Sequence, residues 1–263
     1  MFRPFRILAL VVTLLVAGVG CKARADVLVA VRPNGSGTVT VTATLDPDAA
    51  AQVGDLATAV RVDDLRAAGW KVTGPTTSGG NTVLTASKPF AEQRRLGAVM
   101  EELGGPDGPF PGWKLTSSNS FTVSSYELSG KVHLTGSLDQ FSDGDVAAAL
   151  DGFATGRSPD ELKAALAAPG ALTLGVSVVL PGDLDEARGL TEKDPGAGAP
   201  QATYRLGDGT AVDRSVAVTS SATDRSAVLW VIVGGGLIVL AGLLFVAGRR
   251  QARRRRPRPV VPE

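Results

Sequence analysis

Residues 27–45 read VLVAVRPNGSGTVTVTATL. The residues on either side of the Asn34-Gly35 step alternate between Val or Ala and other residues, and they are rich in Val and Thr, which is typical of β-strands. An Asn-Gly step between two such runs is a strong local signal for a β-hairpin. We therefore predict strands at 27–32 and 38–45, joined by a turn at 33–37.

The same pattern returns further along the chain. Short alternating or apolar runs are separated by clusters of Gly, Pro, Ser and Asn, as expected of strands joined by turns. The strands predicted on this basis are residues 70–74, 82–87, 113–122, 124–135, 171–180, 202–206 and 211–219. The run 171–180 is almost continuously apolar, so we expect it to be buried on both faces.

Helices are expected between some of these strands. Asp46 and Pro47 have the composition of an N-cap and a first helical residue. The predicted helices cover residues 46–53, 63–68, 89–103, 142–153 and 158–167. The fold class predicted from these elements is α+β: a mostly antiparallel sheet built from hairpins, with three or four helices covering one face.

The two ends of the chain indicate export and a membrane anchor. A basic and then apolar N-terminus, residues 1–25, is typical of a signal peptide. Residues 228–248, VLWVIVGGGLIVLAGLLFVAG, carry no charge and are long enough for a transmembrane helix. The Arg-rich tail, residues 249–263, is expected to stay in the cytoplasm. An ectodomain at 26–220 and a juxtamembrane stalk at 221–227 lie between them.

The start of the mature chain has two alternatives. Gly20-Cys21 fits lipoprotein processing, which would leave Cys21 acylated as a second, N-terminal anchor, whereas Ala23-Arg24-Ala25 fits ordinary cleavage before Asp26. Cys21 is the only cysteine of the chain, so the ectodomain has no disulfide and depends on core burial for its stability.

Charge and residue content exclude several kinds of function. Residues 26–226 carry 16 basic against 25 acidic groups, and this acidic balance argues against a nucleic-acid partner. His133 is the only histidine, and it lies in an alternating strand. Neither a multi-histidine metal site nor a recognised nucleophile motif is present, and the acidic group Asp183, Asp185 and Glu186 does not match a calcium loop. We expect no enzyme activity, no metal and no cofactor.

Aromatic residues near a Gly-Pro-rich loop are the candidate ligand-binding residues. They are Phe110, Trp113, Phe121 and Tyr126. Exposed aromatic side chains on loops commonly mark recognition surfaces, but the same side chains could instead anchor a hairpin in the core.

The order of these elements resembles the LppM family of actinobacterial envelope proteins. The resemblance rests on VRPNGSG at 31–37, SPDEL at 158–162 and VSVVLPG at 176–182, followed by Gly189. Leu180 and Tyr204 stand where an aromatic residue and a Trp would be expected. The resemblance implies a lipoprotein or membrane protein whose ectodomain binds lipid or glycolipid in an apolar cavity.

Two functions follow as expectations. The first is a non-enzymatic protein of the cell envelope whose extracytoplasmic domain binds a membrane lipid or an envelope glycolipid. The alternative is a protein-interaction or scaffold module at the membrane surface, with an envelope protein as its partner. Both place a single-pass chain in the cell membrane with its C-terminus in the cytoplasm.

Overall fold

The computed structural model describes residues 22–53, 62–104, 108–120, 122–136, 172–190, 199–206, 209–223 and 237. The chain divides into two compact units, residues 1–118 with 125–222 and residues 119–124 with 223–263. The predicted helices at 142–153 and 158–167, the basic tail and Cys21 lie outside the described residues. The described part of the first unit contains both β-sheets and all the helices discussed below.

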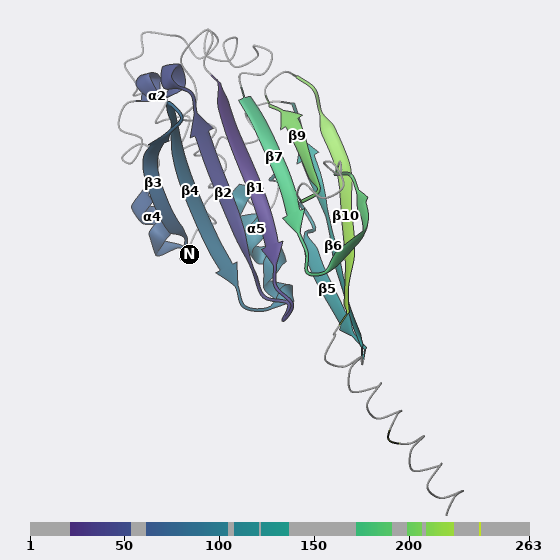
Figure 1. Ribbon diagram of the computed structural model, residues 1–263. Coiled ribbons are helices and arrows are strands. Elements are labelled where there is room, and N and C mark those ends of the chain that lie inside the picture. Colours follow the sequence, from purple (N-terminus) through teal and green to yellow (C-terminus); the bar gives the residue numbers. More distant parts are fainter. Residues whose placement is uncertain are drawn as a thin grey trace, which may run out of the picture. The chain divides into compact units, whose positions relative to one another are not determined.

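The first unit is built on two β-sheets, which corrects the predicted α+β fold (Figure 1). A six-stranded sheet has the order β3-β4-β2-β1-β7-β9, and a four-stranded sheet has the order β5-β6-β10-β8. The strands of the six-stranded sheet are β1 (Ala23–Val31), β2 (Gly37–Leu45), β3 (Lys71–Ser78), β4 (Asn81–Phe90), β7 (Leu172–Val179) and β9 (Gln201–Arg205). Those of the four-stranded sheet are β5 (Lys114–Asn119), β6 (Val123–Leu134), β8 (Asp183–Arg188) and β10 (Val212–Thr223).

The prediction of one sheet covered by helices was wrong for a physical reason. Hairpin signals identify which strands are neighbours, but they do not say which hairpins share a sheet. Strand β8 was also missed, because its sequence DLDEAR has few β-forming residues and it lies at the edge of its sheet. In the described residues, helix is limited to three short α-helices and one 3-10 turn.

The hairpin predicted from residues 27–45 is confirmed. β1 and β2 pair in antiparallel register, with Val27 opposite Val41 and Val29 opposite Val39. These four side chains are almost fully buried, while the alternate positions remain partly exposed, as the period of two predicts. β1 also pairs in parallel with β7, so it is a central strand of the sheet. The expected burial of β7 on both faces is incomplete, because on its second face Thr173 and Ser177 are half-buried and Val179 is exposed.

Helix α2 (Pro47–Val53) begins as the sequence predicted. The Asp46 carboxylate accepts a hydrogen bond of 2.8 Å from the backbone N–H of Ala49, which is the expected N-cap contact. It accepts a second one of 2.7 Å from the N–H of Lys22, just before β1. Helix α4 (Val62–Ala67) is followed by Gly69, whose φ is 86°, as the predicted helix stop at this glycine requires.

The helix predicted at 89–103 starts later than expected. Strand β4 continues to Phe90, which lies opposite Gly37 of β2, and a 3-10 turn, η1 (Gln93–Arg95), leads into α5 (Leu96–Gly104). Pairing with β2 thus overrides the helical periodicity in the first residues of the predicted helix. The predicted apolar face of the helix is confirmed, because its members are all buried: Leu96, Val99, Met100 and Leu103.

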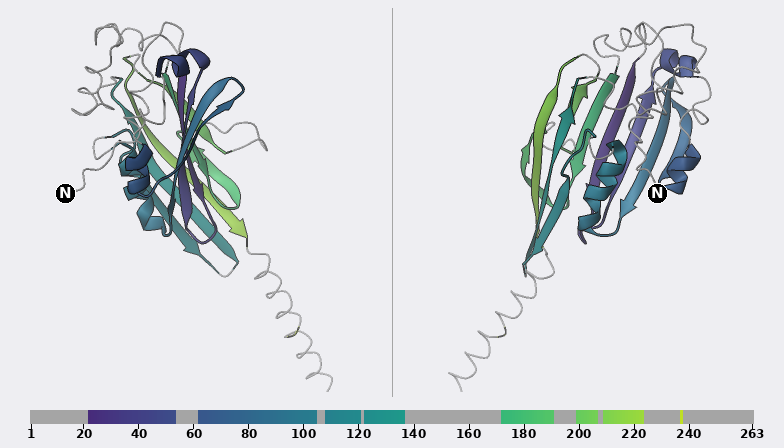
Figure 2. Two further views of the ribbon diagram at one scale, coloured as in Figure 1. Left: turned by 90° about the vertical axis from the view of Figure 1, so that its left-hand side faces the viewer. Right: turned by 180° about the vertical axis from the view of Figure 1, so that it is seen from behind.

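Helix α5 and the four-stranded sheet lie on the same side of the six-stranded sheet (Figure 2). One core cluster contains apolar side chains from all three, including Val27, Leu103 and Val218. A half-buried polar group attaches α5 to β4: Lys88 donates a hydrogen bond of 2.6 Å to Glu102, and Trp70 Nε1 donates one of 3.1 Å to the same carboxylate oxygen. The opposite face of the six-stranded sheet has no helix over it among the described elements.

The described part of the chain contains no helix that is long and apolar enough to cross a membrane. The span predicted at 228–248 lies outside the described residues, apart from Leu237. Strand β10 extends to Thr223 and so includes the first residues of the stretch predicted as a stalk.

Candidate ligand-binding site

Two of the predicted aromatic residues lie in the core. Phe110 and Trp113 are buried, and their rings meet edge to face with centroids 6.1 Å apart. Trp113 Nε1 donates a hydrogen bond of 2.9 Å to the carbonyl of Lys131 on β6. Gly130 makes room for the indole, since a Cβ at this position would lie 2.7 Å from the ring. These contacts hold the segment with Phe110 and Trp113 against β6. A ligand-binding role for Phe110 and Trp113 stays a prediction.

Tyr126 is also buried, and its hydroxyl is satisfied. It donates a hydrogen bond of 2.6 Å to the carbonyl of Pro33, in the turn between β1 and β2. This bond connects the four-stranded sheet to the first hairpin of the six-stranded sheet. Phe121 lies outside the described residues.

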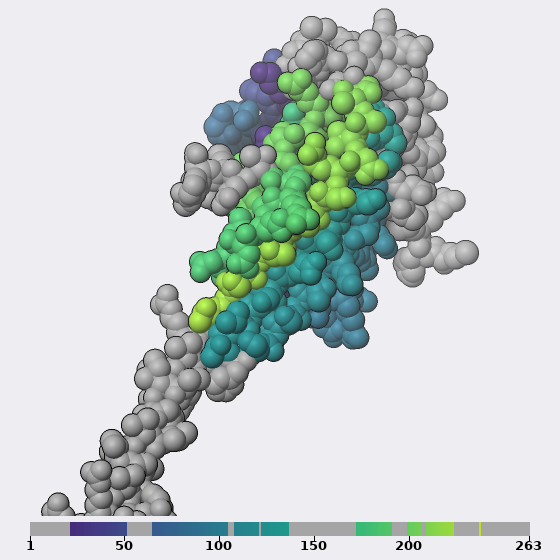
Figure 3. Space-filling view, turned by 90° about the vertical axis from the view of Figure 1, so that its right-hand side faces the viewer, coloured from purple at the N-terminus to yellow at the C-terminus, as the bar shows by residue number. Residues whose placement is uncertain are grey.

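His133 lies on the exposed side of β6, between the buried residues Val132 and Leu134. Its Nδ1 is 3.7 Å from Asp213 Oδ2 on β10, and both side chains are largely exposed to solvent. Within the described ranges, no group of three or more His, Cys, Asp or Glu residues could hold a metal ion. Figure 3 looks onto β8 and β10, where Asp183 and Asp185 are exposed on an edge strand.

The hydroxyl of Tyr204 is the most unusual polar group of the described structure, because it is buried without a hydrogen-bond partner. Tyr204 was not among the predicted site residues. Tyr204 on β9 is about nine-tenths buried, and its hydroxyl has no hydrogen-bond partner. Burial raises the pKa of Tyr204 above its ordinary value, and the nearby positive charge of Arg214 acts in the opposite direction. A buried polar atom without a partner is rare in folded proteins and calls for an explanation.

The surroundings of Tyr204 follow from strand register. Tyr204 lies opposite Leu174 of β7 and shares the inner face of β9 with Ala202 and Leu206. On β10, the residues of inner parity include Val212, Arg214 and the buried Val216. Apolar side chains of both sheets therefore lie near the Tyr204 hydroxyl, whereas Arg214 is exposed to solvent.

Tyr204 and Arg214 lie near the same end of the first unit. β9 ends at Arg205 and β10 begins at Val212, so a short connection leads from one sheet to the other. Tyr204 is the last inward residue of β9, and Arg214 lies two residues before Val216, the first buried residue of β10, and is exposed to solvent. We refer to Tyr204, Arg214 and the adjoining Ala202 and Val212 as the β9–β10 site.

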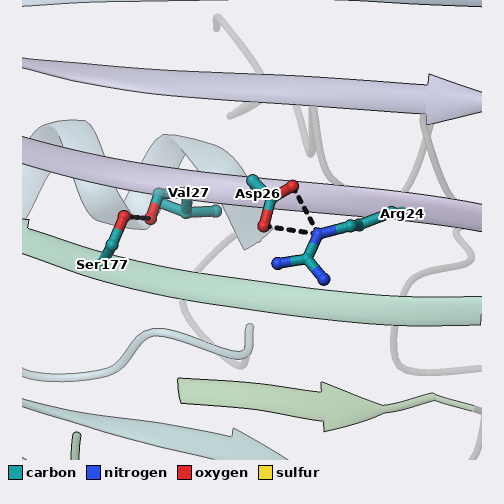
Figure 4. A network of polar contacts seen from close by, with 4 residues as sticks. All are labelled: Arg24, Asp26, Val27 and Ser177. Carbon is teal, nitrogen blue, oxygen red and sulfur yellow. Dashed lines mark hydrogen bonds and ion pairs between the residues drawn. The ribbon is translucent and has the colours of Figure 1, made fainter. Parts of the chain in front are cut away.

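A second arginine shows the contrasting, satisfied arrangement (Figure 4). Arg24 Nε donates hydrogen bonds of 2.9 and 2.7 Å to the two carboxylate oxygens of Asp26, two residues along β1 on the outer face. This contact raises the pKa of Arg24. Gly175 of β7 leaves the space for it, because a Cβ there would lie 2.0 Å from Asp26 Oδ1. Ser177 approaches the carbonyl of Val27 in the same strand pair, at 3.5 Å.

Arg214 differs from Arg24 in its partners. Its described neighbourhood contains no carboxylate within ion-pair distance, although Asp213 precedes it on β10. Sequence reasoning missed the β9–β10 site because Tyr204 and Arg214 each occupy an ordinary place in an alternating strand. The available signal was the position of Tyr204 in the inward row between Ala202 and Leu206.

Comparison with known proteins gives a distant likeness. Neither a family model nor a curated protein sequence matches the chain. Among solved structures, the chain is similar to the NMR structure of the folded domain of Mycobacterium tuberculosis LppM, at 15% sequence identity and a TM-score of 0.38. The match covers 80% of this chain and 96% of that domain. This is a distant fold relationship, and no argument about ligand or function rests on it.

Proposed function

We propose that the protein is a non-enzymatic envelope protein whose extracytoplasmic domain binds a lipid or glycolipid at the β9–β10 site. The observation that carries the proposal is the buried hydroxyl of Tyr204, which has no partner. A hydroxyl removed from water without a hydrogen bond destabilises the folded state by roughly 1–3 kcal/mol. A ligand oxygen that accepts its proton would remove that penalty.

The chemistry around the hydroxyl supports an amphipathic ligand. The neighbouring side chains, Leu174, Leu206 and Val216, are apolar and buried, so they favour hydrocarbon. The polar groups at the site are few, as in most small-molecule sites, where a small number of polar contacts fix the orientation of an apolar ligand. An ester carbonyl or a sugar hydroxyl next to an acyl chain fits both requirements.

The two ends of the chain support the location. The apolar N-terminus and the uncharged run at 228–248 predict export and a membrane anchor. A domain held beside a membrane meets lipid at high local concentration, which favours a ligand drawn from that membrane.

The test is native mass spectrometry of the full-length chain, extracted in detergent from the membranes of the source organism, followed by lipid extraction. The proposal predicts co-purifying lipid at one molecule per chain and its loss from the Tyr204→Phe variant. Tyr126→Phe is the matched control and should retain the lipid. A wild-type protein free of lipid that also fails to take up lipid from envelope extracts would refute the proposal and favour a scaffold that presents its surface to another protein.

A further inference from the structure

We infer that Asn34 is a modification site: it loses its side-chain amide to become Asp or isoaspartate, and opening of the folded β1–β2 turn limits the rate. The modification is independent of lipid binding and needs no partner molecule except water.

The reacting groups are neighbours in the sequence. Asn34-Gly35 is the only Asn-Gly step of the chain, and the Asn34 side chain is exposed. A bond forms between Gly35 N and Asn34 Cγ, the bond from Cγ to the side-chain nitrogen breaks, and ammonia leaves with the proton of Gly35 N. Water then opens the succinimide at either carbonyl, which gives Asp or isoaspartate. Glycine favours the attack, because it has no Cβ to obstruct the approach and few limits on its backbone conformation.

In the folded turn, the attacking nitrogen is occupied. Gly35 N–H donates a hydrogen bond of 2.9 Å to the carbonyl of Arg32. The φ of Gly35 is 77°, the left-handed conformation that ends a hairpin loop with a bulge. Attack on Cγ requires this hydrogen bond to break and the peptide unit between Asn34 and Gly35 to rotate.

The side-chain amide of Asn34 is held as well. Its Oδ1 accepts hydrogen bonds of 3.1 Å from the backbone N–H of Ser36 and 2.7 Å from the Ser36 hydroxyl, the contacts of an Asx turn. Ser36 itself is buried, with 7% of its surface exposed. Both reacting groups are therefore fixed in the closed turn, and the reaction proceeds from molecules in which this end of the hairpin has opened.

The same turn carries a contact between the two sheets. Tyr126 on β6 donates its hydrogen bond of 2.6 Å to the carbonyl of Pro33, the residue before Asn34. Isoaspartate adds a methylene to the main chain, whereas the hydrogen bond from Arg32 N–H to the carbonyl of Ser36 closes a loop of fixed length. The isoaspartate form should lose this closure and the fixed position of the Pro33 carbonyl.

The experiment follows the three Asn residues of the full-length chain in detergent at mildly alkaline pH, by peptide mass spectrometry over time. Asn34 should react at least about 10-fold faster in urea than in the folded protein, because local opening limits only the folded protein. Asn81 and Asn119 precede Thr and Ser, whose side chains obstruct the attack, and should react more slowly than Asn34 in urea.

Ser36→Ala removes one donor to Oδ1. In the folded protein it should raise the Asn34 rate about 2- to 10-fold, the factor that corresponds to the usual net strength of one hydrogen bond. In urea its rate should equal that of wild type, since Gly35 is unchanged. Ser177→Ala is the matched control, because it makes the same change on β7, outside the turn, and should react like wild type in both conditions.

Three results would overturn the inference. Equal Asn34 rates in folded and unfolded wild type would mean that the turn gives no protection. A slower reaction in folded Ser36→Ala would mean that the hydrogen bonds to Oδ1 promote the attack by stabilising its developing charge. Isoaspartate protein, separated after ageing, should melt at a lower temperature than Asn34→Asp, which has the same charge and an unchanged main chain; equal melting temperatures would contradict the loss of loop closure.

Discussion

The two tyrosines of the chain predict opposite effects for the same chemical change. Tyr126 donates a hydrogen bond to Pro33, whereas the Tyr204 hydroxyl is buried without a partner. Replacing either residue by Phe removes one hydroxyl group and nothing else. In lipid-free protein, Tyr126→Phe should lower the free energy of unfolding by about 0.5–1.5 kcal/mol, the usual net value of a hydrogen bond.

Tyr204→Phe should instead raise the free energy of unfolding, by about 1–2 kcal/mol, because it removes a desolvation penalty without breaking a bond. For a domain of this size, each kcal/mol corresponds to about 2–4 °C in the melting temperature. The assay is thermal unfolding followed by tryptophan fluorescence, with and without lipid.

Saturating lipid should reverse the order of wild type and Tyr204→Phe, because only the wild type then gains a hydrogen bond to the ligand. A Tyr204→Phe variant that is less stable than wild type by 1 kcal/mol or more after delipidation would refute the reasoning. Such a result would mean that the hydroxyl has a partner within the protein.

Three further predictions follow from the described contacts. Gly130→Ala should destabilise the fold by about 1–3 kcal/mol, measured by urea unfolding, because its Cβ would meet the buried indole of Trp113. Because burial raises the pKa of Tyr204, the unfolded chain loses the phenolic proton first as the pH rises above 10; the wild type loses stability there, and the stability advantage of Tyr204→Phe should widen. Residues 23–25 pair with both β2 and β7, so the intact mass of the mature protein should include them, with Cys21 as its first residue.

Each of these three predictions has a specific outcome that would contradict it. An unchanged urea midpoint for Gly130→Ala would mean that the indole moves away at no cost. A constant stability gap across alkaline pH would mean that Tyr204 ionises as in the unfolded chain. A mature chain that begins at Asp26 would remove the first residues of a central strand, and the register of β1 with β7 would need revision.

Local sequence signals predicted the local structure well. The alternation and turn residues of 27–45 identified the β1–β2 hairpin, and Asp46 marked the start of α2, because both depend on contacts between residues close in the chain. The late start of α5 could not be foreseen, since the pairing of Phe90 with Gly37 depends on a strand distant in sequence.

Long-range arrangement explains the remaining differences. The separation into two sheets depends on which apolar faces pack together, and the period-two pattern of a strand is the same in either arrangement. The candidate site also depends on contacts between residues distant in the sequence. The burial of Phe110 and Trp113 and the unpaired hydroxyl of Tyr204 arise from strands brought together by folding, so residue type and spacing did not distinguish them.

The most direct test of lipid binding at the β9–β10 site uses the fact that the chain contains two tyrosines. Full-length protein labelled with ¹³C at the ring carbon that bears the hydroxyl should give two resonances in an NMR spectrum, assigned by the two Phe variants. Titration with phosphatidic acid should shift the Tyr204 resonance in a saturable way and leave that of Tyr126 in place. Saturable lipid binding without any shift of the Tyr204 resonance would contradict the account.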